Sequence, residues 1–302
     1  MTGGGGFLAR ADAKSPRAGL WQPSIPFDGL IGAAKSELSE QNQTTVTQSL
    51  AASGQVAAAQ MGYKLGRVGD GANDGQATFG GVDTTKFTGQ LVEVPNVSKV
   101  GFFEGGSFPH SAAGRVARRW ADSSVALQTA AAMDSVAVDG QDLSLAGRTA
   151  ILDTGTTLMV IPPNDAATIH ATIPGAVSDN QGNFAVPCNT ASVVALTVGG
   201  QAFTVNPSDL AFQPLSGAGV DGLCLSGVSS GQIGGPNEWL VGDVFLKNVY
   251  YATDAGADTV GLAALPNSVP NPGGGGGGGS AANAGGKLGS PAALPSFTLV
   301  LD

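Results

Sequence analysis

One carboxylate stands between two apolar segments in the run RTAILDTGTTLMVIPP, residues 148–163. Asp153 follows Ala-Ile-Leu and precedes Leu-Met-Val-Ile, a pattern typical of two buried strands. A carboxylate in that setting is costly to ionise unless hydrogen bonds hold it. The next four residues supply amide and hydroxyl donors: Thr154, Gly155, Thr156 and Thr157. The run therefore predicts a carboxylate at the tip of a strand–loop–strand segment, held in a fixed orientation as catalytic groups are. A capped turn with a structural Asp is the alternative that also fits Asp-Thr-Gly.

The composition predicts β structure and excludes one class of partner. Charged residues make up 12% of the 302 residues, and 47 residues are glycine. Low charge, few long helix formers and abundant Gly, Ser, Thr and Val are typical of strands joined by many turns. The net charge is −9 and the pI about 4.5, so the chain lacks the basic face that nucleic-acid phosphates require.

Cysteine and histidine content limits the kinds of site. Cys188 and Cys224 fit either one disulfide in an oxidising compartment or two buried free thiols. His110 and His170 are the only histidines and no close cysteine pair exists, so no zinc site, other metal or cofactor is expected. No segment is apolar enough to span a membrane, and residues 1–17 lack the apolar run of a signal peptide.

Strand signals recur at short intervals along the chain. Asp139-Gly140 interrupts the alternating pattern of residues 135–145, and Gly199-Gly200 does the same within 193–206. Both predict hairpin turns, and residues 249–265 predict a third hairpin. Regular short strands with such turns favour an all-β sandwich or barrel-like domain.

Only two short helices are expected. Residues 44–56 form one, capped near Thr45. Residues 164–175 form the other, after a Pro-Pro pair and with Asn164 or Asp165 as the N-cap.

Several segments together resemble the pepsin-like aspartic proteases that fungi secrete. AILDTGTTLMVIP resembles the second-lobe Asp-Thr/Ser-Gly motif of that family. WLVGDVFLKNVYYATDAGADTVGLAAL, residues 239–265, resembles its closing stretch. PFDGLIGAAKSELS, residues 26–39, and ATFGGVDTTKFTGQLVEVPN, residues 77–96, resemble the later part of the first lobe. Cys188 and Cys224 fall where the second-lobe disulfide of the family is expected.

The resemblance implies an all-β, bilobal acid protease fold with an incomplete first lobe and a complete second lobe. It implies an aspartic endopeptidase, monomeric and secreted or cell-wall associated, that acts on peptides or proteins. In that mechanism two facing carboxylates share one proton and activate a water, with no metal or cofactor. Asp153 would be one of the pair, Thr154 would bond to the opposite loop, and Thr156 would hold the outer carboxylate oxygen.

In these terms the chain divides into five zones. They are an unmatched leader at 1–18, the remainder of the N-terminal lobe at 19–104, an unmatched insertion at 105–125, the C-terminal catalytic lobe at 126–266 and a Gly-rich flexible tail at 267–302. We interpret the leader and the insertion as sequence foreign to the protease, with a surface loop as the alternative for the insertion. The tail is interpreted as a linker, since its last residues are too short for a lipid-anchor signal.

The second Asp of the pair is missing from its expected place. Apart from Asp153, the sequence holds no Asp-Thr-Gly or Asp-Ser-Gly, and Asp83-Thr84-Thr85 lacks the glycine. The first-lobe loop should lie before Phe27, so we expect a chain truncated in that lobe, weak or inactive, with unpaired sheet edges. Two alternatives stay open: a non-catalytic peptide-binding or cell-wall-associated module, and a homodimer in which two copies of Asp153 face each other.

Two Gly-containing triplets, two sequons and one histidine carry further predictions. The triplets Leu30-Ile31-Gly32 and Leu240-Val241-Gly242 hint at duplicated lobes, and in the resemblance the second belongs to the loop that the catalytic strand crosses. Asn42 and Asn96 begin glycosylation sequons, which matter only if the protein is secreted. His170 is expected to be a surface or packing residue.

Overall fold

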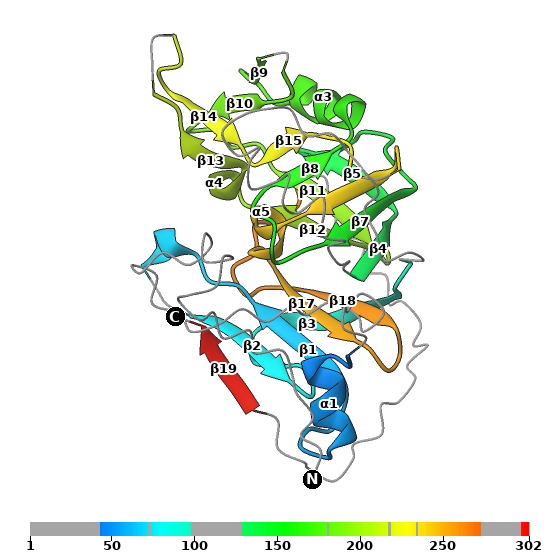
Figure 1. The fold of residues 1–302 in the computed structure, drawn as a ribbon. Helices are drawn as coiled ribbons and strands as arrows, with labels where there is room; N and C mark the ends of the chain where they lie inside the picture. Colours follow the sequence, from blue (N-terminus) through cyan, green and yellow to red (C-terminus); the bar gives the residue numbers. More distant parts are fainter. Residues whose placement is uncertain are drawn as a thin grey trace, which may run out of the picture.

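Strands are the main regular secondary structure of the folded chain. The computed structural model describes residues 43–71, 74–97, 129–179, 181–216, 219–233, 235–272 and 297–301. The described helices are short: α1 (Val46–Ala52), the 3-10 turn η3 (Val68–Asp70), α3 (Pro163–Thr172), α4 (Pro207–Leu210) and α5 (Asp243–Leu246). The predicted all-β class is therefore confirmed (Figure 1). No helix in these ranges is long and apolar enough to cross a membrane.

A six-stranded antiparallel sheet fills the lower part of the view in Figure 1. In sheet order its strands are β19 (Phe297–Leu301), β2 (Gly75–Phe79), β1 (Gln60–Lys64), β17 (Val249–Asp254), β18 (Thr259–Ala264) and β3 (Thr88–Pro95). β17 pairs with β1, and β18 pairs with β3. Strands from the zones 19–104 and 126–266 therefore share this sheet: β17 and β18 of the second zone lie between β1 and β3 of the first.

Three smaller sheets form the upper part of the molecule. The five-stranded sheet has the order β15 (Val228–Ser230), β8 (Met159–Ile161), β16 (Glu238–Val241), β7 (Arg148–Leu152) and β4 (Thr129–Met133). One four-stranded sheet has β12 (Gln201–Val205), β11 (Val194–Val198), β5 (Ser135–Val138) and β6 (Gln141–Asp142). The other has β13 (Ala211–Pro214), β14 (Leu223–Ser226), β10 (Phe184–Pro187) and β9 (Val177–Ser178). Asp153 follows β7, which runs parallel to β16.

The three predicted hairpins are all present. Asp139-Gly140 joins β5 to β6, and Gly199-Gly200 joins β11 to β12. Asp139 and Gly140 have φ angles of 51° and 80°, the left-handed values that a two-residue type I′ turn requires. The third hairpin joins β17 to β18.

Both predicted helices form, but one cap was wrongly assigned. α1 begins after Thr45, whose hydroxyl accepts from Gln48 N while the Gln48 side chain accepts from Thr45 N. α3 begins at Pro163, and its N-cap position is Pro162, which offers no side-chain hydrogen bond. Neither Asn164 nor Asp165 is the cap, because Pro163 takes the first helical position and both residues lie inside the first turn.

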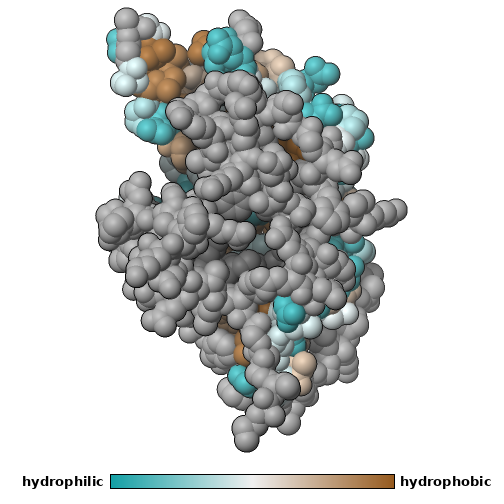
Figure 2. Space-filling model, in the orientation of Figure 1, coloured by the Kyte–Doolittle hydropathy of each residue, from teal (hydrophilic) through white to brown (hydrophobic). Residues whose placement is uncertain are grey.

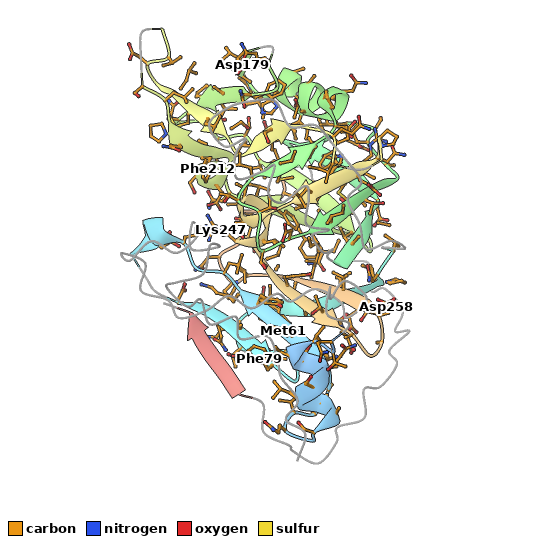
Figure 3. All side chains as sticks on the ribbon, in the orientation of Figure 1. Met61, Phe79, Asp179, Phe212, Lys247 and Asp258 are labelled. Carbon is orange, nitrogen blue, oxygen red and sulfur yellow. A yellow bond between two sulfur atoms is a disulfide. The ribbon has the colours of Figure 1, made fainter. Side chains whose placement is uncertain are left out.

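One continuous hydrophobic core joins the lower and upper parts of the molecule. Met61 and Phe79, labelled in Figure 3, contribute to it from the six-stranded sheet. Trp239, Phe245 and Ile169 contribute from the upper part and are fully buried. Each such side chain removed from water stabilises the fold by roughly 1.5–3 kcal/mol. The outer end is mixed, since Figure 2 shows both hydrophilic and hydrophobic residues there, and Val177 of β9 is an exposed hydrophobic side chain.

The predicted disulfide is present. Cys188 bonds to Cys224, and the bridge links the end of β10 to β14 across 36 residues of sequence. Cys188 is exposed and Cys224 is buried. Closing a loop of that length in the unfolded chain stabilises the fold by about 3–4 kcal/mol in the chain-entropy account.

The end of the predicted flexible tail contains a strand. β19 pairs with β2 along five residues, from Phe297 opposite Phe79 to Leu301 opposite Gly75. This edge of the sheet is therefore paired, where the sequence had predicted open edges. The segment Phe-Thr-Leu-Val-Leu has the β-branched and aromatic residues of a strand, and β2 offers it an unpaired backbone. The leader 1–18 and the insertion 105–125 lie outside the described residues.

His170 is a packing residue, and its ring has one defined tautomer. Its side chain is 4% exposed and stacks on Phe184 with ring centroids 4.0 Å apart. Nδ1 lies 2.7 Å from Ala166 O and Nε2 lies 2.8 Å from Ser226 Oγ. Because a carbonyl only accepts, Nδ1 carries the proton, and neutral Nε2 accepts from the Ser226 hydroxyl. Burial lowers the pKa of His170, with a smaller opposing effect from the Ala166 carbonyl.

We predict that His170→Gln makes the fold less sensitive to acid. Because the pKa of His170 is depressed in the folded state, the stability from its neutral ring is present above 6.5 and is lost as the pH falls below that value. Near neutral pH the variant should be less stable by about 1–2 kcal/mol, through lost hydrogen bonds. Urea unfolding should show this difference shrinking at lower pH.

His110→Gln is the control, since it removes the other histidine. A stability difference between wild type and His170→Gln that stays constant with pH would contradict the assignment. Equal pH behaviour of the two variants would contradict it as well.

Candidate active site

The Asp153 carboxylate is held by its own loop. Gly155 N donates to Oδ1 at 2.9 Å, and the Thr156 hydroxyl donates to Oδ2 at 2.5 Å. The backbone of Asp153 is fixed from the neighbouring strand, because its amide donates to Val241 O at 3.0 Å. The residue is partly exposed, and no cation pairs with it within the described part of the chain. Asp153 is thus an oriented carboxylate that remains available to solvent.

The four supporting residues play different parts in this loop. Thr156 donates its hydroxyl to Asp153 Oδ2, and Gly155 supplies an amide to Oδ1. Thr157 contributes its carbonyl, which accepts from Val244 N at 3.0 Å. The exposed Thr154 side chain makes no hydrogen bond with a described residue, so its implied bond to an opposite loop stays a prediction.

Gly242 is the point at which the Asp153 loop crosses the end of β16. β16 lies between β7 and β8, so the chain must pass over the end of β16 on its way from one to the other. A Cβ at Gly242 would lie 2.1 Å from Thr156 O and 2.6 Å from Leu158 O. The next amide, Asp243 N, donates to Thr156 O at 2.8 Å. Only glycine fits this crossing, which gives the triplet Leu240-Val241-Gly242 its structural role.

Asp243 is a second carboxylate near the Asp153 loop, and the sequence analysis missed it. Its Oδ1 is buried and has no hydrogen-bond partner among the residues that the structure describes. Burial raises the pKa of Asp243 to about 6, the positive charge of Lys247 opposes the rise, and the Asp153 carboxylate adds to it. Figure 3 labels Lys247 where the upper part meets the lower sheet. The available signal was its place directly after the Leu240-Val241-Gly242 triplet.

The remaining predicted residues lie elsewhere or are not described. Asn42 falls outside the described residues. The Asn96 side chain bridges two segments, since Nδ2 donates to Asp258 Oδ1 at 2.9 Å and Oδ1 accepts from Ala130 N at 3.0 Å. A glycan on Asn96 therefore stays a prediction, and it would have to leave this bridge in place. Asp83 accepts from Gln76 and Thr85 in a structural turn.

The described residues offer no stronger candidate site elsewhere. Among the described residues no three His, Cys, Asp or Glu side chains gather as metal ligands would. A small hollow on the six-stranded sheet is lined by Gln60, Glu93 and Asp254 among others, and none of its lining residues belongs to the Asp153 loop. The loop at Asp153 is therefore the site that the chemistry of these side chains favours.

We predict that Gly242→Ala displaces the Asp153 loop. The new methyl group would meet backbone atoms, which cannot rotate away as a side chain can. The expected loss is about 3 kcal/mol of unfolding free energy, the upper end of overpacking costs. Gly81→Ala is the matched control, because a Cβ there meets nothing within 4 Å. Equal stability of the two variants in urea unfolding would refute the crossing.

We predict that Asp243→Asn changes how stability depends on pH. The folded-state pKa of Asp243 is raised from 3.8 to about 6, so between pH 3.8 and about pH 6 the folded chain keeps a proton on Asp243 that the unfolded chain releases. The stability that this proton contributes is lost as the pH rises from 3.8 to about 6. Asparagine stays neutral, so the variant should gain stability relative to wild type across this interval and keep the gain above it. The exposed carboxylate Asp221 provides the control variant Asp221→Asn. A gain that does not vary with pH would speak against a buried, titrating Asp243.

Comparison with known proteins identifies the relatives of this chain. The profile of the family described as eukaryotic aspartyl protease matches residues 11–265. A probable aspartic-type endopeptidase CTSD from Trichophyton verrucosum is 36% identical over 258 residues, which cover 83% of this chain and 45% of the relative. The aspartic-type endopeptidase ctsD of Aspergillus fumigatus is 31% identical over 250 residues, which cover 82% of this chain and 46% of the relative.

A more distant relative shows how far the similarity extends. Cathepsin D of Dictyostelium discoideum is 28% identical over 242 residues, covering 78% of this chain and 55% of that protein. The chain spans about half the length of the curated relatives it matches. With the family profile matched over most of its length and the Asp-Thr-Gly loop at the end of β7, the chain belongs to the eukaryotic aspartyl protease family.

Proposed function

We propose that Asp153 is one of the two catalytic carboxylates of an aspartic endopeptidase. The observation that carries the proposal is the state of its side chain, which is oriented by Gly155 N and the Thr156 hydroxyl and is partly exposed. An ionised carboxylate in that position can take a proton from a bound water, which then attacks the peptide carbonyl. A second, protonated carboxylate would polarise the carbonyl and return a proton to the leaving amine.

The sequence offers no clear candidate for the second carboxylate of the pair. Its 302 residues hold one Asp-Thr-Gly and no Asp-Ser-Gly. Asp243 is not a good substitute, because its Oδ1 is buried. We therefore infer that a polypeptide of these residues alone is weakly active or inactive. Loss of one general acid–base group lowers rates by roughly 10²–10⁴-fold.

Membership of the family supports a proposal for the substrate and the cellular setting. The substrates would be peptides or proteins with apolar side chains beside the cleaved bond, and the working form would be a monomer. The disulfide between Cys188 and Cys224 supports an oxidising environment, as for a secreted or cell-wall-associated protein. The single Asp-Thr-Gly also favours a second candidate function, a non-catalytic module that binds peptides.

The test is an assay of the purified chain on denatured haemoglobin at acid pH, with and without pepstatin. The expected result is no pepstatin-sensitive cleavage, and no difference between wild type and Asp153→Asn. Binding of the peptide-like inhibitor, measured by calorimetry in the same buffers, separates an inactive chain that still holds peptides from one that does not.

The other outcomes are informative in different ways. Pepstatin-sensitive cleavage that Asp153→Asn abolishes would refute inactivity and support the catalytic role of Asp153. If that rate rises with the square of the chain concentration, two copies of Asp153 supply the pair. Cleavage that persists in Asp153→Asn, with Asp221→Asn as the control, would remove Asp153 from the mechanism.

A further inference from the structure

Asp165 is a buried carboxylate whose two oxygens are both hydrogen-bonded. The side chain is 3% exposed. Oδ1 accepts from Arg148 Nη2 at 2.9 Å, and Oδ2 accepts from Arg148 Nε at 2.8 Å. Oδ2 also accepts from the indole Nε1 of Trp239 at 2.8 Å, and that indole is fully buried. The arrangement is a two-pronged ion pair with a third donor, in which Asp165 and Trp239 are buried and Arg148 is partly exposed.

The three residues belong to the three chain segments that build the Asp153 site. Arg148 is the first residue of β7, the strand that leads into Asp153. Trp239 lies on β16, the strand that leads into Gly242 and Asp243. Asp165 lies on α3, which follows β8, the strand that leaves the Asp153 loop. One carboxylate therefore joins all three segments at the ends opposite to the site.

The register of these strands decides whether the site can form. β7 and β16 are parallel and far apart in sequence, so no hairpin turn fixes their alignment. Val241 pairs with Leu152, and this alignment places Gly242 under Thr156 O. A slip by one residue would bring Val241 or Asp243 to the place where only glycine fits, and would turn every side chain of β16 to the other face.

We propose that Asp165 is a positioning residue for the active site: by binding Arg148 and Trp239 it fixes the alignment of β7, β8 and β16 and so the place of Asp153 relative to Gly242 and Asp243. The proposal rests on the proposed function only in taking Asp153 to be the reacting group. The positioning itself is a property of the folded chain and is measurable without activity. Consistent with a charged partner, burial raises the pKa of Asp165 but the Arg148 and Trp239 hydrogen bonds outweigh it and leave the pKa lowered.

A purely stabilising ion pair is the alternative, and the two roles differ in one consequence. Apolar residues of similar size often replace a buried ion pair without loss of stability. If the cluster only stabilises, Arg148→Met combined with Asp165→Leu should restore both stability and site geometry. If the cluster positions the strands, the apolar pair can restore stability while the site stays altered.

The experiment compares three variants of the full chain: Asp165→Asn, the double variant Arg148→Met with Asp165→Leu, and Asp209→Asn. Asp209 is the matched control, since it accepts from Arg67 Nε at 3.0 Å and from Asn248 Nδ2 at 2.9 Å, and neither donor lies on β7, β8 or β16. Urea unfolding reports stability. Carbon-detected NMR reports the titration midpoint of the Asp243 carboxyl, and amide spectra report the signals of Asp153 and Gly155.

The expected result is a shift of about half a pH unit or more in the Asp243 midpoint for both Asp165 variants, with displaced amide signals of Asp153. Asp209→Asn should lose stability and leave these signals in place. Unchanged Asp153 and Asp243 signals in either folded Asp165 variant would overturn the proposal. If Asp165→Asn does not fold, the apolar double variant decides, and Trp239→Phe, which removes one donor and keeps an aromatic ring, provides the same readout.

These readouts separate the proposal from the proposed function. A chain without peptidase activity still gives the NMR and unfolding results. Displaced site signals in an inactive chain would support the positioning role and count only against catalysis. Fixed site signals in an active chain would overturn positioning and leave catalysis in place.

Discussion

The structure of the site depends on one close backbone approach. Gly242 lies so near the carbonyls of Thr156 and Leu158 that no side chain fits between them. This contact lets the segment after Asp153 cross the end of β16, and the first amides of α5 then satisfy the carbonyls of Thr156 and Thr157. The same crossing brings Asp243 next to the Asp153 loop and leaves one of its oxygens buried. The course of the Asp153 loop over β16 and the burial of Asp243 thus follow from a single packing constraint.

Two buried titrating groups respond to acid in opposite directions. Neutral Asp243 is favoured at lower pH, because burial raises the pKa of its carboxyl. Neutral His170 is favoured at higher pH, because burial lowers the pKa of its ring. Both act within the lobe that carries Asp153, so their effects on stability oppose each other in mildly acid solution.

Local patterns predicted local structure, and contacts between distant segments were beyond them. Asp139-Gly140 specifies its hairpin, because both residues tolerate positive φ angles. Thr45 specifies the start of α1, because it forms a capping box with Gln48 three residues later. Asp165 looked like a helix cap because its partners, Arg148 and Trp239, lie 17 and 74 residues away. The pairing of β1 with β17 joins residues nearly two hundred positions apart, and neither strand carries a mark of its partner. Asp153 was found because its motif is local, whereas Asp243 becomes important only through the crossing.

The central claim is that Asp153 is a working half of a carboxylate pair, and a chimera tests it most directly. Residues 129–265 of this chain would replace the aligned segment of the Aspergillus fumigatus aspartic-type endopeptidase ctsD, which would supply the rest of the protein. The account predicts that the chimera cleaves denatured haemoglobin at acid pH and that Asp153→Asn lowers its rate by at least about 10²-fold. A folded chimera whose rate is unchanged by Asp153→Asn would contradict the account.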